Sequence, residues 1–149
     1  MAQTYFGSTL RAGSGTLTDT VDGGFVVMTQ TTTVTTVSAG TAVSATLTLP
    51  ASSQIINIFV DMVRDEVVGG GTATTLPITV GTVAAGTQYV SSTDLFAGGR
   101  AAASFTTAQL LAMSDIGTNQ SVVLTADPNG TISTTQAIIR MTVVYAQKV

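Results

Sequence analysis

The chain of 149 residues has no histidine, no cysteine and no tryptophan, and only 9% of its residues are charged. It therefore has no imidazole base, no thiol nucleophile, no disulfide and none of the usual zinc ligand sets. A serine nucleophile would also have no convincing base, because the only lysine is Lys148. These absences predict that the protein is not an enzyme and that it has no catalytic residue, no metal site and no cofactor.

Positive charge is scarce as well. Five lysine and arginine residues stand against eight aspartate and glutamate residues, for a formal net charge of −3, so no basic field attracts phosphate and no nucleic-acid partner is expected. The longest apolar stretch, Ile55 to Val63, is interrupted by Asn57 and Asp61 and is far shorter than a bilayer span, so no membrane association is expected. The N-terminal residues show no basic segment followed by an apolar one, which predicts a protein made and used without secretion.

Carboxylates are the remaining candidates for chemistry. A glycosidase would need two of them a few ångströms apart across a cleft. The acidic residues within 61–66 stand where a strand runs out into a glycine loop, and they are interpreted as a solvated strand end. Asp19 and Asp22 lack the spacing of a calcium-binding loop. The four arginines are scattered along the chain and are interpreted as surface residues or intramolecular partners.

Threonine, valine and alanine dominate what is present, and they alternate over long stretches. β-branched side chains and a period of two favour β-strands. The middle of Phe25–Val37 is polar on both faces, which predicts an edge strand or a strand completed by a neighbouring subunit. Ile55–Arg64 and Ala137–Ala146 are apolar on both faces and are expected at the centre of a sheet. The predicted strands are Phe25–Val37, Val43–Leu49, Ile55–Arg64, Leu76–Val83, a short one at Gln88–Val90, Val122–Ala126, one from Thr131 and Ala137–Ala146.

Turn residues predict how some of these strands connect. Gly69–Gly71 predicts a hairpin with a long tip between the strands on either side of it. Asp127–Gly130, with the sequence Asp-Pro-Asn-Gly, predicts a second hairpin at the end of Val122–Ala126. Only Thr106–Met113 has helical character, with Thr106 or Thr107 as its N-cap.

These elements predict an all-β fold. We expect an antiparallel β-sandwich or a jelly-roll-like barrel, with an extended N-terminal arm and at most one short helix. Residues 1–24, rich in glycine and threonine, form the predicted arm, and residues 25–149 form a single β-sandwich domain. Tyr5 and Phe6 have no local core to bury them, so with Arg11 they are the candidate interface residues.

The low share of charged residues predicts self-assembly or a partner, because isolated soluble domains normally carry more charge. Part of the chain also resembles small β-rich virion proteins of tailed bacteriophages, often head decoration or cement proteins. The resemblance covers about residues 43–146 and consists of strand and turn patterns. The segments that carry it are ATLTLPA at 45–51, IINIFVDM at 55–62, TVGT at 79–82, DLFAGGR at 94–100 and QAIIRMTVVY at 136–145.

The resemblance implies a structural virion protein that binds the outside of a phage capsid and stabilises it. Its implied partners are the major capsid protein and further copies of itself, as a homotrimer. The implied location is the capsid surface of the virion, after synthesis in the host cytoplasm. Two alternatives stay open: a tail, collar or fibre-associated structural subunit, and a carbohydrate-binding surface module, although aromatic residues make up only 5% of the chain.

Overall fold

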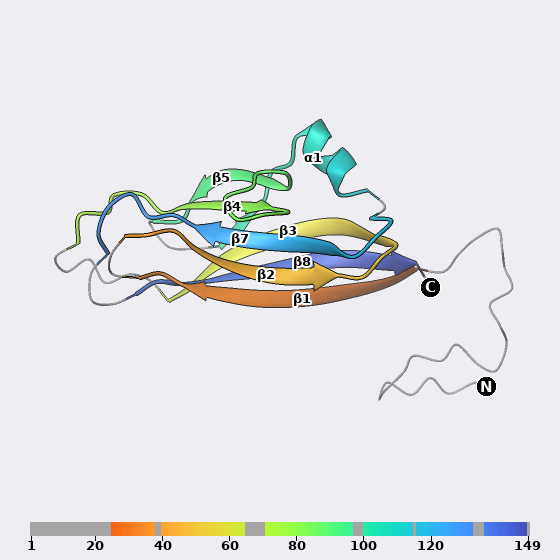
Figure 1. The fold of residues 1–149 in the computed structure, drawn as a ribbon, viewed down its shortest axis with the longest axis horizontal. Coiled ribbons are helices and arrows are strands. Elements are labelled where there is room, and N and C mark those ends of the chain that lie inside the picture. The colour runs from red at the N-terminus through yellow and green to blue at the C-terminus, as the bar shows by residue number, and fades with distance from the viewer. Residues whose placement is uncertain are drawn as a thin grey trace, which may run out of the picture.

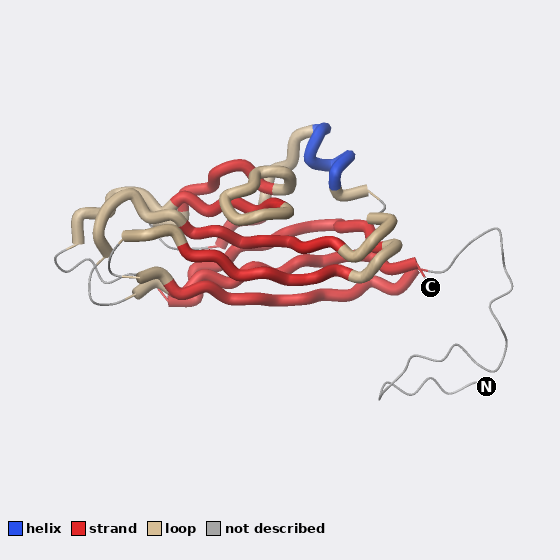
Figure 2. Tube along the Cα trace, in the orientation of Figure 1, coloured by secondary structure: helices blue, strands red, loops and turns tan. Residues whose placement is uncertain are grey.

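The computed structural model describes residues 25–37, 40–64, 71–96, 100–114, 116–132 and 136–148. Within these ranges the chain forms eight β-strands and one short helix (Figures 1 and 2). The predicted all-β fold with a single short helix is confirmed for this part of the chain. The elements are β1 (Phe25–Thr35), β2 (Val43–Leu49), β3 (Ser53–Arg64), β4 (Pro77–Gly81), β5 (Val90–Asp94), β6 (Arg100–Ala102), α1 (Thr107–Ala112), β7 (Gln120–Ala126) and β8 (Ile138–Lys148).

The strands form two four-stranded antiparallel sheets, in the orders β1-β8-β3-β6 and β2-β7-β4-β5. Successive strands alternate between the two sheets except that β5 stays beside β4. This order is that of a double-sheet jelly roll. The sandwich form of the prediction is therefore confirmed, and the two sheets do not close into one barrel.

The core lies between the two sheets. In β8 the inward row of Ile139, Met141, Val143 and Tyr145 is buried, while Arg140 points outward and is exposed. This row meets buried residues from the facing sheet, among them Leu49, Ile78, Val80 and Leu124. Burial of such rows is the main stabilising contribution of a sandwich, at roughly 25 cal/mol for each Å² of apolar surface removed from water.

The positions of three strands agree with their sequence patterns. β8 lies between β1 and β3, and β3 lies between β8 and β6, so both strands predicted to be central are central. β1 is the edge strand of its sheet, as its polar middle predicted. The sequence did not predict β6, which has only three residues and pairs with β3 through Phe59, Val60 and Asp61.

Both predicted hairpins are wrong. β3 and β4 belong to different sheets. No strand begins at Thr131, whose carbonyl accepts from Thr72 N and Ala73 N, and the next described strand, β8, lies in the other sheet from β7. The turn after β7 does have a positive φ at Gly130, but its backbone bonds to the segment before β4: Asn129 N donates to Thr75 O at 3.0 Å. Turn chemistry acts on four residues, whereas the partner of a strand depends on which pairing buries its apolar rows.

The helix α1 is positioned by its N-terminus and by one buried polar side chain. Thr106 is the N-cap, and the Gln109 side chain accepts from Thr106 N at 2.9 Å, which completes a capping box. Gln109 Nε2 also donates to Thr87 O at 3.2 Å and to Ser91 Oγ at 3.1 Å. The predicted cap is confirmed, and these bonds fix α1 above β5 and the loop before it (Figure 1).

Candidate interaction surface

The outer face of the β1-β8-β3-β6 sheet is the first candidate surface. Along β1 the residues Thr29, Thr31, Thr33 and Thr35 are exposed, and Val27 retains 62% of its accessible surface. The neighbouring strand β8 contributes Thr142, whose hydroxyl lies 3.4 Å from that of Thr31. This face therefore presents hydroxyl groups and β-branched methyl groups to its surroundings. Such a surface can be covered by a partner at a low desolvation cost.

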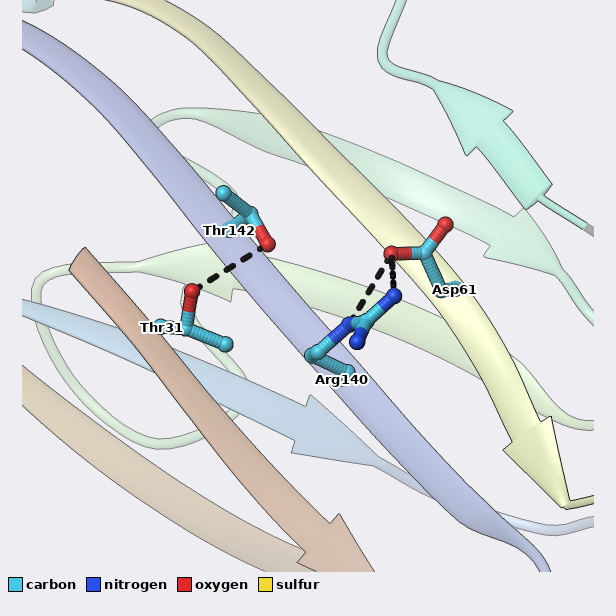
Figure 3. A network of polar contacts seen from close by, with 4 residues as sticks. All are labelled: Thr31, Asp61, Arg140 and Thr142. Carbon is cyan, nitrogen blue, oxygen red and sulfur yellow. Dashed lines mark hydrogen bonds and ion pairs between the residues drawn. The ribbon is translucent and has the colours of Figure 1, made fainter. Parts of the chain in front are cut away.

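An ion pair crosses this face between β3 and β8 (Figure 3). Asp61 and Arg140 are directly opposite in the strand register. Arg140 Nη2 donates to Asp61 Oδ2 at 3.1 Å and Arg140 Nε donates to the same oxygen at 3.2 Å. Asp61 is only 6% exposed, whereas the Arg140 side chain is 44% exposed. The arginine therefore covers the carboxylate and presents its remaining surface outward.

The interpretation of the acidic strand end is corrected at one residue. Asp61 is a buried member of β3 and is not solvated, because β3 extends to Arg64 and places the Asp61 carboxylate beside Arg140. The intramolecular interpretation of Arg140 is confirmed. Residues 65–70, which include the other two acids of that cluster, lie outside the described part of the chain.

The described carboxylates do not assemble a ligand site. Asp94 Oδ1 accepts from the backbone N–H groups of Leu76, at 2.8 Å, and of Phe96, at 3.0 Å, so this carboxylate holds two loop segments together. Among the described residues no three acidic side chains gather where they could hold a metal ion. Asp19 and Asp22 lie outside the described residues. Within the same described part, no helix is long and apolar enough to cross a membrane.

A second candidate surface lies at α1. Leu110 is 54% exposed and Leu111 is 74% exposed, and Val83 is exposed in the loop that bonds to Gln109. The sequence predicted the helix but not this exposure. The sequence carried no clear signal of it, because adjacent leucines such as Leu110 and Leu111 commonly lie together on one buried stripe of a helix.

The predicted interface residues Tyr5, Phe6 and Arg11 lie outside the described residues, as does the whole predicted arm, residues 1–24. The described residues begin at Phe25, directly after this segment. Phe25 begins β1 and pairs with Lys148, the last residue of β8, so residues 1–24 precede the edge strand of the β1-β8-β3-β6 sheet.

Comparison with known proteins gives one informative result. No family model and no curated protein matches the chain. The fold resembles a phage capsid chain. One similar structure is a chain of the cyanophage Pam1 capsid asymmetric unit, with a TM-score of 0.60 and 20% sequence identity. The match covers 95% of this chain and 99% of that one. The shared feature is the fold over nearly the whole of both chains.

Proposed function

We propose that this protein is a structural virion protein that binds the outside of a phage capsid and stabilises it. The observation that carries the proposal is the fold shared with a chain of the Pam1 capsid asymmetric unit. An asymmetric unit of a capsid holds the chains that the symmetry of the shell repeats. This supports a place on the head over a place in a tail, collar or fibre.

The extent of the match adds to this support. It covers 95% of this chain and 99% of the other, so the shared fold extends over nearly the whole of both. The proposed role therefore belongs to the jelly roll itself. The proposed partner is a shell built by another protein, the major capsid protein.

The surface supports the same role. A threonine-covered sheet face and the exposed Leu110 and Leu111 offer contacts that depend little on charge. Each contact is weak by itself, but many copies on one shell sum their contributions through multivalency. The proposal includes binding to the major capsid protein, assembly as a homotrimer, and no role for nucleic acid, a membrane, a cofactor or catalysis.

The test is co-sedimentation of the purified protein with intact phage heads and with heads stripped of their decoration proteins. We expect saturable binding to stripped heads at a fixed copy ratio, and stripped heads that regain resistance to heat once the protein is bound. Binding to isolated tails but not to heads would overturn the proposal in favour of a tail subunit. Binding to cell-surface glycans but to neither particle would favour a carbohydrate-binding module.

Tyr5, Phe6 and Arg11 are the proposed contacts of the N-terminal segment. Their test compares the Tyr5→Ala, Phe6→Ala double variant with a Leu110→Ala, Leu111→Ala double variant in the same sedimentation assay. We expect the first pair to reduce head occupancy at least tenfold. Unchanged occupancy with Tyr5 and Phe6 removed would show that this segment is not the anchor. A loss confined to the leucine pair would place the contact at α1.

A further inference from the structure

β1 is a long edge strand whose second side has no strand paired to it among the described residues. Its eleven residues pair with β8 in one unbroken register, from Phe25 opposite Lys148 to Thr35 opposite Ile138. The β3–β8 pairing, by contrast, shifts register twice. An unbroken strand at a sheet edge is a template for one more strand.

The hydrogen-bonding direction along β1 follows from one bond just beyond its end. Thr36 N donates to Ala137 O at 3.0 Å, so Thr36 faces β8. Backbone groups alternate in direction along an antiparallel strand. The N–H and C=O groups of Thr29, Thr31, Thr33 and Thr35 therefore point away from β8, toward the open side.

Native proteins often protect such an edge with charged residues or proline, and β1 contains neither. Its sequence, FVVMTQTTTVT, has no charged residue and no proline. The opposite flank of the sandwich is different: β6 has three residues and includes Arg100, while β5 has five, ends at Asp94 and has a register shift against β4. Short strands, charges and irregular pairing are the common means of preventing edge-to-edge contact. The two flanks thus differ in the way expected if only the β1 flank forms a contact.

We propose that β1 pairs with β1 of a second copy of this chain, antiparallel and about a two-fold axis at Thr31. The axis places Thr31 opposite Thr31 of the second copy, and Thr29 opposite its Thr33. A two-fold contact sets each strand against itself, so any charge near the axis would meet its like. β1 has no charge, and a second β1 is therefore an acceptable partner along the whole pairing.

The same cross-strand chemistry already occurs inside the molecule. Ser44 and Thr125 are opposite each other on β2 and β7, and their hydroxyl oxygens lie 2.9 Å apart. Thr31 and Thr142 are opposite on β1 and β8, with hydroxyl oxygens 3.4 Å apart. Paired threonines across the two-fold axis would repeat this arrangement between subunits and continue the four-stranded sheet into a sheet of eight.

This inference goes beyond the proposed capsid role and does not depend on it. The two-fold contact joins two single chains, or two chains that belong to neighbouring trimers. If the protein does not bind phage heads, the β1 pairing is still expected in solution. If it does bind heads, the β1 pairing can still be absent. Each proposal can therefore be overturned without the other.

Disulfide trapping tests the pairing directly, because the natural chain has no cysteine. Directly opposite residues of a hydrogen-bonded antiparallel pair have Cα atoms about 5.5 Å apart, within the range that a disulfide spans. We expect Thr31→Cys to give a disulfide-linked dimer under mild oxidation at least tenfold faster than Ser92→Cys. Ser92 is the matched control, an exposed hydroxyl residue on the edge strand β5. Equal rates for the two variants would overturn the proposal.

Mass in solution, by light scattering, is the second measurement. Thr31→Pro removes an N–H that faces away from β8, so it blocks the pairing without removing a hydrogen bond of the sheet. Thr31→Lys is the second variant, for use if the proline variant does not fold. It places two like charges opposite each other at the two-fold axis, which disfavours the pairing. We expect each to have no more than half the mass of the unmodified protein, with the Ser92→Lys mass unchanged. An unchanged mass in a folded Thr31 variant, or crosslinking of Thr31→Cys only to a head protein, would overturn the proposal.

Discussion

Asp61 Oδ2 accepts both the Nε and the Nη2 hydrogen bonds of Arg140, across two strands that are 79 residues apart in the chain at this point. A buried carboxylate needs such donors, because burial without them costs several kcal/mol. The two bonds form only when Asp61 lies opposite Arg140, so the ion pair stabilises the observed register of β3 against β8 (Figure 3).

Replacing Arg140 with methionine tests this pair. The variant keeps an unbranched apolar side chain and removes the two donors. Because the Arg140 side chain is 44% exposed, we expect a loss of about 1–2 kcal/mol in the free energy of unfolding, below the figure for a fully buried pair. Urea denaturation measures it, with Thr33→Val on the adjacent strand as the control. A loss as small as that of the control would show that Arg140 does not stabilise Asp61.

Thr36, the residue that follows β1, bonds to Ala137, the residue that precedes β8. Thr36 is fully buried, and its Oγ1 accepts from Ala137 N at 2.9 Å. Thr36→Val keeps the shape and removes this acceptor, which leaves a buried N–H group without that bond. We expect a loss of about 1–3 kcal/mol in the free energy of unfolding. Thr46→Val, at an exposed position of β2, should change it by less than about 0.5 kcal/mol. Equal values for the two variants would contradict the prediction.

Tyr89 predicts how stability changes at alkaline pH. Burial raises the pKa of the Tyr89 phenol above its usual value of 10.0, because the buried site disfavours the phenolate. Above about pH 10 the unfolded chain therefore loses this proton before the folded chain does, and the free energy of unfolding falls as the pH rises. Below that pH the tyrosine causes no change.

The measurement is the free energy of unfolding from pH 8 to pH 11, for the natural chain and for Tyr89→Phe. We expect the difference between the two to be constant up to about pH 9.5 and then to change in favour of the phenylalanine variant. Parallel curves through pH 11 would show that Tyr89 titrates alike in the folded and unfolded states.

Alternation within single segments located most of the strands. Val43–Leu49 alternates apolar and polar residues, and these are the bounds of β2. A threonine N-cap at Thr106 or Thr107 located α1, and the polar middle of β1 located a sheet edge. Each of these features depends on residues within a few positions of one another, so it can be recognised before any tertiary contact is known.

Features that join distant segments could not be predicted in the same way. The Asp-Pro-Asn-Gly turn correctly marks the end of β7, but β8 pairs with β1 and β3 instead of with β7. The burial of Asp61 depends on Arg140, and the three residues of β6 are defined by β3 alone. A local pattern carries no information about which distant strand provides the partner.

The sequence by itself determined that this protein is all-β, has little charge and presents an uncharged edge strand, because composition and a period of two act locally. Only the tertiary structure decided that the strands form a jelly roll, that Asp61 is buried beside Arg140, and that β1 and β5 differ as edges. Those outcomes depend on which arrangement of the eight described strands buries the most apolar surface while pairing the most backbone groups. Both quantities depend on contacts between segments that are distant in the sequence, so no single segment determines the arrangement.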